Sequence, residues 1–134
     1  MSQENVESCR RAVDAWNRHD VDVWLEQAAP NVEWIPASPA AVERSIYRGH
    51  EEIRQAFAAI WETWEEFRFE ESEIRDLGED SLLWLGRVHA RGRASHVQLE
   101  HEFSIHVLGR DGLVTRAEAF LTWEEGLEAA GLAE

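Results

Sequence analysis

Hydrophobic positions recur at helical spacing at both ends of the chain and alternate through most of its second half. The spacing predicts a first helix from Ser2 to about His19, whose buried face is formed by Val6, Cys9, Val13 and Trp16. Asp20 or Asp22 caps a short second helix that Pro30 brings to an end. A third helix follows His50, and its apolar side carries Ile53, Phe57, Ile60, Trp61 and Trp64. A short helix at residues 124–130, stopped by Gly131, ends the pattern.

Alternation of apolar and polar residues predicts an antiparallel sheet. Strands are expected at residues 32–35, 67–77, 82–92, 96–108 and 113–123. Arg110-Asp111-Gly112 suits a three-residue hairpin loop with Gly112 in the left-handed conformation. In that register, the numbers of facing residues sum to 222, so that odd residues face odd residues.

The hairpin register decides which side chains share a face of the sheet. Odd residues of its two strands are mostly apolar and include His101, Phe103, Ala119 and Leu121, so we expect this face to pack against the helices. Even residues are mostly polar and are expected to meet water or a second subunit. Helices on one face of a curved sheet define an α+β domain, and nothing divides residues 1–134 into more than one domain.

Composition narrows the classes of partner. There are 13 basic and 27 acidic residues, giving a formal charge of −14, and every basic residue is Arg. An acidic surface repels phosphate backbones and anionic lipid, so nucleic-acid and membrane partners are not expected. Without Lys, Schiff-base chemistry is excluded. One cysteine, no apolar run of membrane length and no export signal at the start indicate a soluble domain of the reducing cytoplasm.

Several segments resemble the nuclear transport factor 2-like superfamily, in particular its SnoaL-like and ketosteroid-isomerase-like bacterial members. The resemblance is carried by residues 15–20, 32–34, 47–51, 87–89, 110–114 and 124–132. It implies a cone-shaped α+β barrel of the cystatin-like kind, with a mixed, mainly antiparallel sheet wrapped around the helices. It also implies one deep pocket, and often a homodimer. The scaffold hosts isomerases, cyclases, dehydratases and non-catalytic binders, so it does not by itself define a function.

Two activities of related proteins fit poorly. Limonene-type epoxide hydrolases carry Arg-x-Asp on a pocket strand, where this chain has Arg87-Val88-His89, and a second Asp at the position matched to Ala119. Their Tyr-x-Asn corresponds to Val32-Glu33-Trp34. The ketosteroid-isomerase pattern lacks its donor and base, since Tyr47 is the only tyrosine and lies in a predicted loop. Epoxide hydrolysis by that mechanism is therefore not expected.

By analogy with the pocket strand of the family, Arg87 and His89 are expected to point inward, within reach of His101. An Arg with two imidazoles could polarise a carbonyl group while one His moves a proton. The alternative is that Arg87 pairs with an inward carboxylate and that both histidines are core or rim residues whose hydrogen bonds are satisfied. No cofactor or metal is expected: His96, His101 and His106 alternate between faces, and a His89–His101 pair has no recognised ligand motif to support it.

The resemblance also points aromatic residues into the pocket. Its expected lining residues are Trp16, Trp34, Trp61, Leu85, Phe103, Ala119 and Leu121. Aromatic side chains facing small alanines favour a small, hydrophobic molecule as ligand. Three hypotheses stay open: cofactor-free acid–base isomerisation, cyclisation or dehydration; ligand binding without turnover; and a pocketless interaction domain. A homodimer is expected through the outer sheet face, where Phe120, Val114 and Trp84 are predicted to form an aromatic patch.

Overall fold

A computed structural model describes residues 2–38 and 43–132. The helices are α1 (Ser2–Asn17), α2 (Val21–Glu26), α3 (Gly49–Thr63) and α4 (Trp123–Ala129). The strands are β1 (Ala28–Ile35), β2 (Tyr47–Arg48), β3 (Trp64–Gly78), β4 (Ser81–Gly92), β5 (Gln98–Arg110) and β6 (Leu113–Phe120). They form one sheet in the order β2-β1-β6-β5-β4-β3. Among the strands of the described residues, only the β1–β6 pair is parallel, so the expected mixed, mainly antiparallel α+β architecture is confirmed.

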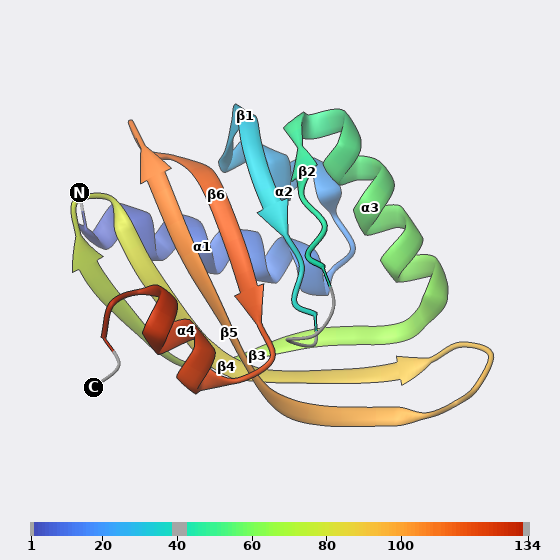
Figure 1. The fold of residues 1–134 in the computed structure, drawn as a ribbon. Helices are drawn as coiled ribbons and strands as arrows, with labels where there is room; N and C mark the ends of the chain where they lie inside the picture. Colours follow the sequence, from blue (N-terminus) through green and yellow to red (C-terminus); the bar gives the residue numbers. More distant parts are fainter. Residues whose placement is uncertain (1, 39–42, 133–134) are drawn as a thin grey trace.

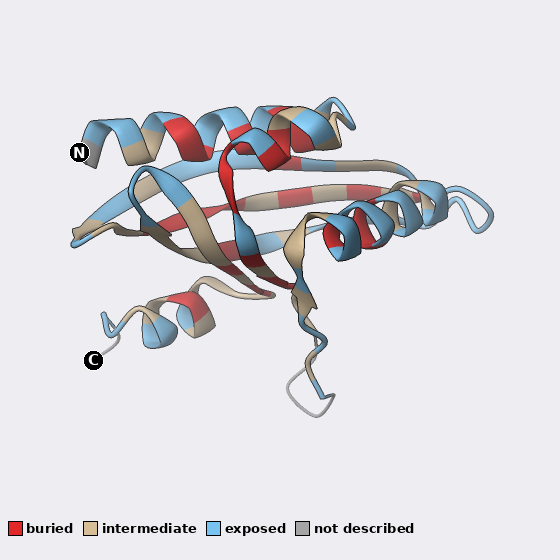
Figure 2. Cartoon of the chain, turned by 90° about the horizontal axis from the view of Figure 1, so that it is seen from above, coloured by how far each residue is buried: buried red, intermediate tan, exposed pale blue. Residues whose placement is uncertain are grey.

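The sheet curves around three of the helices. Figure 1 shows α1, α2 and α3 on its concave side, with the long strands β3, β4 and β5 extending beneath α3. Figure 2 shows α1 and α4 on opposite sides of the sheet. Gly126 of α4 packs closely on Ser104 and Leu83, which lie on the convex side of β5 and β4. Helix α4 therefore covers part of the convex face.

Capping residues place the helices close to where the sequence predicts them. The Asp20 carboxylate accepts a hydrogen bond from the backbone N–H of Val23 at the start of α2. That helix ends before Pro30, which is instead part of β1. Trp64, expected on the third helix, begins β3, because the backbone is already extended there. Within residues 2–38 and 43–132, no helix has the length and apolar character needed to cross a membrane.

The β5–β6 hairpin is tighter than predicted. Arg110 pairs directly with Leu113, so that only Asp111 and Gly112 form the turn, both with positive φ. A shift beside Gly109 then makes the facing numbers sum to 224 rather than 222, as in the pair Ile105–Ala119. From Leu108 back to Ser104 the sum is even, so the predicted assignment of faces holds there. Next to the turn Gly109 faces Val114, the assignment is reversed, and Val114 lies beneath α1.

Candidate functional site

A cavity of about 470 Å³ opens between α3, the concave face of the sheet and the loop after β1. Its wall is formed by Trp16, Trp34, Pro36, Ala37, Tyr47, Ala56, Ala59, Ile60, Thr63, Trp64, Phe67, Phe69, Val88, Ala90, Leu99, His101, Phe103 and Leu121. No Arg, Asp or Glu of the described chain is among them. The cavity has the size and apolar character of a small-molecule site.

One aromatic wall of the cavity is fixed by hydrogen bonds from α1 to the edge strand β3. The Asn17 side chain donates to the carbonyl of Phe69 (3.0 Å) and accepts from its N–H (2.8 Å). The Trp16 indole N–H donates to the carbonyl of Phe67 (2.9 Å). These bonds satisfy edge groups that would otherwise lack partners. Phe69 stacks between Trp16 and Phe103, with ring centroids 5.1 and 5.2 Å away.

Arg93, in the connection between β4 and β5, holds the end of α3 next to the lining residues Thr63 and Trp64. Its guanidinium donates to the carbonyls of Glu62 (3.1 Å) and Trp61 (3.2 Å) at the end of α3. A cation at this end of a helix satisfies free carbonyl groups and opposes the helix dipole. The contact therefore positions Thr63 and Trp64 beside the tip of the long β4–β5 hairpin.

Polar groups in the wall are few. His101 Nδ1 bonds the backbone carbonyl of Glu102 (2.7 Å), and the Thr63 hydroxyl donates to the carbonyl of Ala59 (3.0 Å). The Trp34 side chain is buried, and its indole N–H has no hydrogen-bond partner in the described chain. Tyr47, on the two-residue strand β2 that sequence analysis did not predict, supplies a hydroxyl.

Five of the predicted site residues lie in this wall: Trp16, Trp34, His101, Phe103 and Leu121. Their functional roles stay predictions. Trp61 is not among the lining residues, because its ring packs on Trp16 and Phe57 and stacks on His19 at 4.7 Å. Trp16 thus contacts both other predicted tryptophans, at 6.3 Å from Trp34 and 5.2 Å from Trp61, without filling the cavity.

Leu85 and Ala119 also lie outside the wall. Leu85 pairs with Ser104 on the convex side, where it is buried beside α4. Ala119 does face the helices, as predicted, but it is fully buried opposite Ile105, away from the open space.

The predicted placement of Arg87 and His89 in the pocket is wrong. In the β4–β5 pair, the residue numbers of two facing residues add to an odd value. Val88 is therefore opposite His101, and His89 is opposite Glu100. Val88 and Ala90 therefore face the cavity, whereas Arg87 and His89 face outward. Arg87 is not near His101 but pairs with Glu100 (3.3 Å). The catalytic trio and the alternative His89–His101 metal pair are both excluded, because the sheet separates their members.

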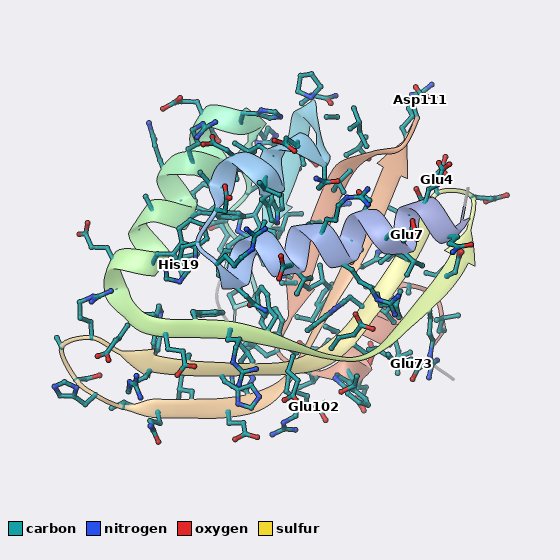
Figure 3. All side chains as sticks on the ribbon, turned by 180° about the vertical axis from the view of Figure 1, so that it is seen from behind. Glu4, Glu7, His19, Glu73, Glu102 and Asp111 are labelled. Atoms are coloured by element: carbon teal, nitrogen blue, oxygen red, sulfur yellow. The ribbon has the colours of Figure 1, made fainter. Side chains whose placement is uncertain are left out.

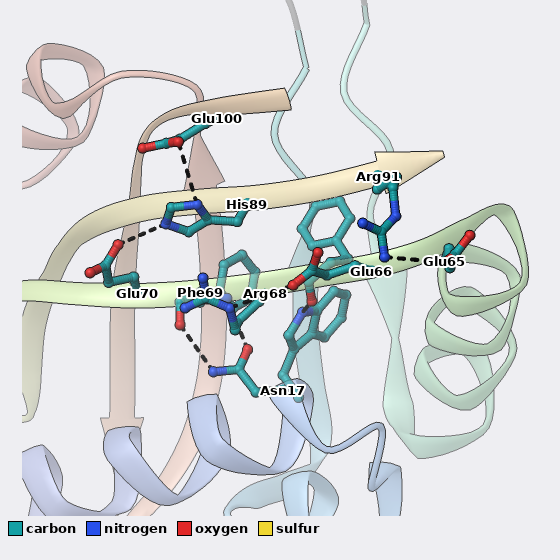
Figure 4. A network of polar contacts seen from close by, with 11 residues as sticks. Asn17, Glu65, Glu66, Arg68, Phe69, Glu70, His89, Arg91 and Glu100 are labelled. Atoms are coloured by element: carbon teal, nitrogen blue, oxygen red, sulfur yellow. Dashed lines mark hydrogen bonds and ion pairs between the residues drawn. The ribbon is translucent and has the colours of Figure 1, made fainter. Parts of the chain in front are cut away.

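His89 belongs to an ionic network on the convex face, shown in Figure 4. Its Nε2 contacts Glu70 (2.7 Å) and its Nδ1 contacts Glu100 (3.7 Å). The hydrogen bond from His89 lowers the pKa of the Glu70 carboxyl. These groups are exposed to solvent, where such pairs stabilise a fold only weakly. The alternative reading is met in one part, because Arg87 does pair with a carboxylate, but this carboxylate lies on the outward face and not inside.

The aromatic patch predicted on the outer face is also wrong. Trp84 lies in the core, and Val114 lines a small space beneath α1. Phe120 does face outward, but the guanidinium of Arg44 covers its ring at 4.8 Å. Among the described residues, no group of three or more His, Cys, Asp or Glu could hold a metal ion.

Sequence analysis missed several lining residues, and alternation could have identified four of them. Phe67 and Phe69 are separated by a charged residue, as are Val88 and Ala90 by His89. This pattern places the apolar members on the covered face of a strand. It contradicted the family analogy that turned Arg87 and His89 inward.

A six-stranded sheet curved around helices and an aromatic cavity defines the class of fold seen in nuclear transport factor 2-like proteins. Three solved structures show it. An NTF2-like protein of unknown function from Burkholderia pseudomallei has TM-score 0.78 and 19% identity, with 93% of this chain and 95% of that one covered. TerC co-crystallised with polyporic acid has TM-score 0.77 and 20% identity, with coverage of 93% and 98%. A putative polyketide cyclase from Xanthomonas campestris has TM-score 0.76 and 15% identity, with coverage of 96% and 97%.

The particular family follows from the sequence itself. The family model described as SnoaL-like domain matches residues 9–117. The chain belongs to this family, and the resemblance noted in the sequence is confirmed. A search of curated proteins gives no match.

Proposed function

We propose that the protein binds a small, uncharged and largely apolar molecule in the cavity and that His101 transfers a proton to or from it without a cofactor. The observation that carries the proposal is a cavity of about 470 Å³ whose wall is aromatic and aliphatic and holds one imidazole. A charged ligand would lose its hydration on entering the cavity, and the described wall offers no opposite charge to compensate this loss. The co-crystallisation of TerC with polyporic acid shows that a protein of this fold can receive a small molecule.

Unused hydrogen-bonding capacity supports a ligand. Buried N–H groups nearly always have a partner, yet the indole N–H groups of Trp34, Trp61 and Trp84 have none in the described chain, and of these three Trp34 lines the cavity. An oxygen atom of a bound molecule, after a small movement of the ring, could accept this hydrogen bond. Tyr47 adds a hydroxyl on the same wall. His101 would take a proton from the ligand, and these donors would stabilise the oxygen that gains negative charge.

Binding is tested with the neutral fluorescent probe N-phenyl-1-naphthylamine. Ala90→Phe adds a ring where the wall of the cavity faces empty space, so binding should fall at least about tenfold. Ala94→Phe adds the same ring at an exposed position outside the wall and serves as the matched control. If Ala90→Phe binds as tightly as the unaltered protein, the cavity is not the binding site.

Proton transfer is tested separately, by nuclear magnetic resonance of hydrogen–deuterium exchange beside the carbonyl of 2-tetralone. The unaltered protein should accelerate exchange and His101→Gln should not, while both still bind the fluorescent probe. Binding without any acceleration favours the second candidate function, a binding protein without turnover. That candidate is supported by the described wall, which holds no carboxyl group to act as a second acid or base beside His101.

The homodimer and the cytoplasmic location stay predictions from the sequence. With the aromatic patch gone, a dimer through the outer face would join ionic surfaces, such as the one formed by Arg87, His89, Glu70 and Glu100.

A further inference from the structure

The imidazole of His101 has one nitrogen committed to its own chain and one without a partner. Its Nδ1 lies 2.7 Å from the carbonyl oxygen of Glu102. A carbonyl oxygen only accepts hydrogen bonds, so Nδ1 must carry the hydrogen. In the neutral ring, Nε2 is then left with a lone pair and is a hydrogen-bond acceptor.

Nothing in the described chain uses that acceptor. No hydrogen bond to Nε2 is formed, and no acidic side chain lies in the cavity wall. The other polar side-chain groups of the wall are N–H donors or hydroxyls: the indoles of Trp16, Trp34 and Trp64, and the hydroxyls of Tyr47 and Thr63. His101 Nε2 is thus the single nitrogen acceptor on the described wall.

We infer that the ligand of this cavity is a phenol or an enol, whose acidic O–H group donates a hydrogen bond to Nε2 of His101. The inference rests on the proposed function, because it names the chemical class of the molecule that the cavity binds. An aromatic or conjugated ring bearing one hydroxyl satisfies both parts of the site. Its flat apolar surface meets rings such as Phe69 and Phe103, and its hydroxyl meets the free nitrogen. An ether, or a ketone that cannot enolise, lacks the hydrogen that this nitrogen needs.

The test compares 2-naphthol with 2-methoxynaphthalene, two uncharged ring systems that differ in whether the oxygen carries a hydrogen. Their dissociation constants are measured by quenching of tryptophan fluorescence, since Trp16, Trp34 and Trp64 line the cavity. We expect 2-naphthol to bind about five- to tenfold more tightly, the effect of one neutral hydrogen bond in a dry site.

His101→Phe keeps a ring but removes both nitrogens, and the preference for 2-naphthol should disappear. His89→Phe makes the same substitution on the convex face and should keep the preference, so it is the matched control. Should His101→Phe fail to fold, as judged by circular dichroism, His101→Leu replaces it.

Each result has a distinct meaning. Equal binding of the two compounds by the unaltered protein overturns the inference and leaves the proposed cavity intact. A preference that survives in His101→Phe also overturns it, because another group must then accept the hydrogen. If neither compound binds, nor the probe N-phenyl-1-naphthylamine, the proposed function itself fails.

Discussion

Replacing Gly86 with alanine should destabilise the protein more than any other glycine-to-alanine change in a strand or turn. Gly86 is buried in the middle of β4, between Glu71 on β3 and Phe103 on β5. An added Cβ would lie 2.1 Å from the backbone oxygen of Glu70 and 2.5 Å from the ring of Trp84. A normal carbon–oxygen contact is about 3.3 Å, so β3 would have to move by about 1.2 Å.

The cost follows from what holds β3 in place. Such a movement breaks about two ladder hydrogen bonds, each contributing about 1 kcal/mol, and leaves buried polar groups without partners. Trp84 is also fully buried and cannot swing away from the new methyl group. We therefore expect a loss of about 3–5 kcal/mol in the free energy of unfolding, a large part of the about 5–15 kcal/mol that a domain possesses.

Urea denaturation followed by tryptophan fluorescence measures this loss. Gly112→Ala is the matched control: its Cβ would meet nothing within 4 Å, and its only cost is the left-handed backbone at φ +83°, about 1–2 kcal/mol. If Gly86→Ala loses no more stability than Gly112→Ala, the sheet can adjust at this point, and the close approach of Glu70 and Trp84 does not exclude a side chain.

Two further predictions concern titratable groups. Burial raises the pKa of the Cys9 thiol to about 12, so the folded protein should not react with dithionitrobenzoate at about pH 8, whereas the denatured protein should; rapid labelling of the folded protein would contradict this. Burial lowers the pKa of His106 from its usual 6.5, so the unfolded chain takes up this proton first and the stability contributed by neutral His106 is lost as the pH falls below about 6.5. His106→Gln should flatten the fall of the unfolding free energy between about pH 7 and pH 5, and unchanged profiles would refute the assignment.

The sequence predicted element types well because they depend on local spacing. The helix carrying Ile53 and Phe57, the cap at Asp20 and the turn at Gly112 all depend on neighbours a few residues away. The face on which Arg87 lies depends on the length of the connection between β4 and β5, since one residue more or less reverses every side chain. The analogy with the family could not show which alternate residues of β4 face the cavity.

The two halves of strand β4 lie in different surroundings, and this explains why Arg87 and His89 were expected on the wrong face. Residues Leu82 to Leu85 are all buried, since α4 covers the convex side there and the core covers the other. Beyond Gly86, α4 no longer covers the sheet, and charged residues alternate with apolar ones. When a strand is buried on both faces, its sequence does not show which side chains face the helices. Only the second half, with Val88 and Ala90, reveals which side is covered.

The charged side chains lie outside the cavity, and this relates the acidic composition of the chain to the proposed uncharged ligand. The acidic side chains are spread over the surface, as Figure 3 shows for Glu4 and Glu7 on α1, Glu73 on β3 and Glu102 on β5. Anions are therefore repelled before they reach the mouth, and the described wall offers no arginine to receive them. An uncharged phenol or enol meets neither barrier. His101, the residue proposed to bind it, lies on β5 beside the exposed Glu102, whose backbone carbonyl accepts the hydrogen of Nδ1 and so leaves Nε2 as the acceptor.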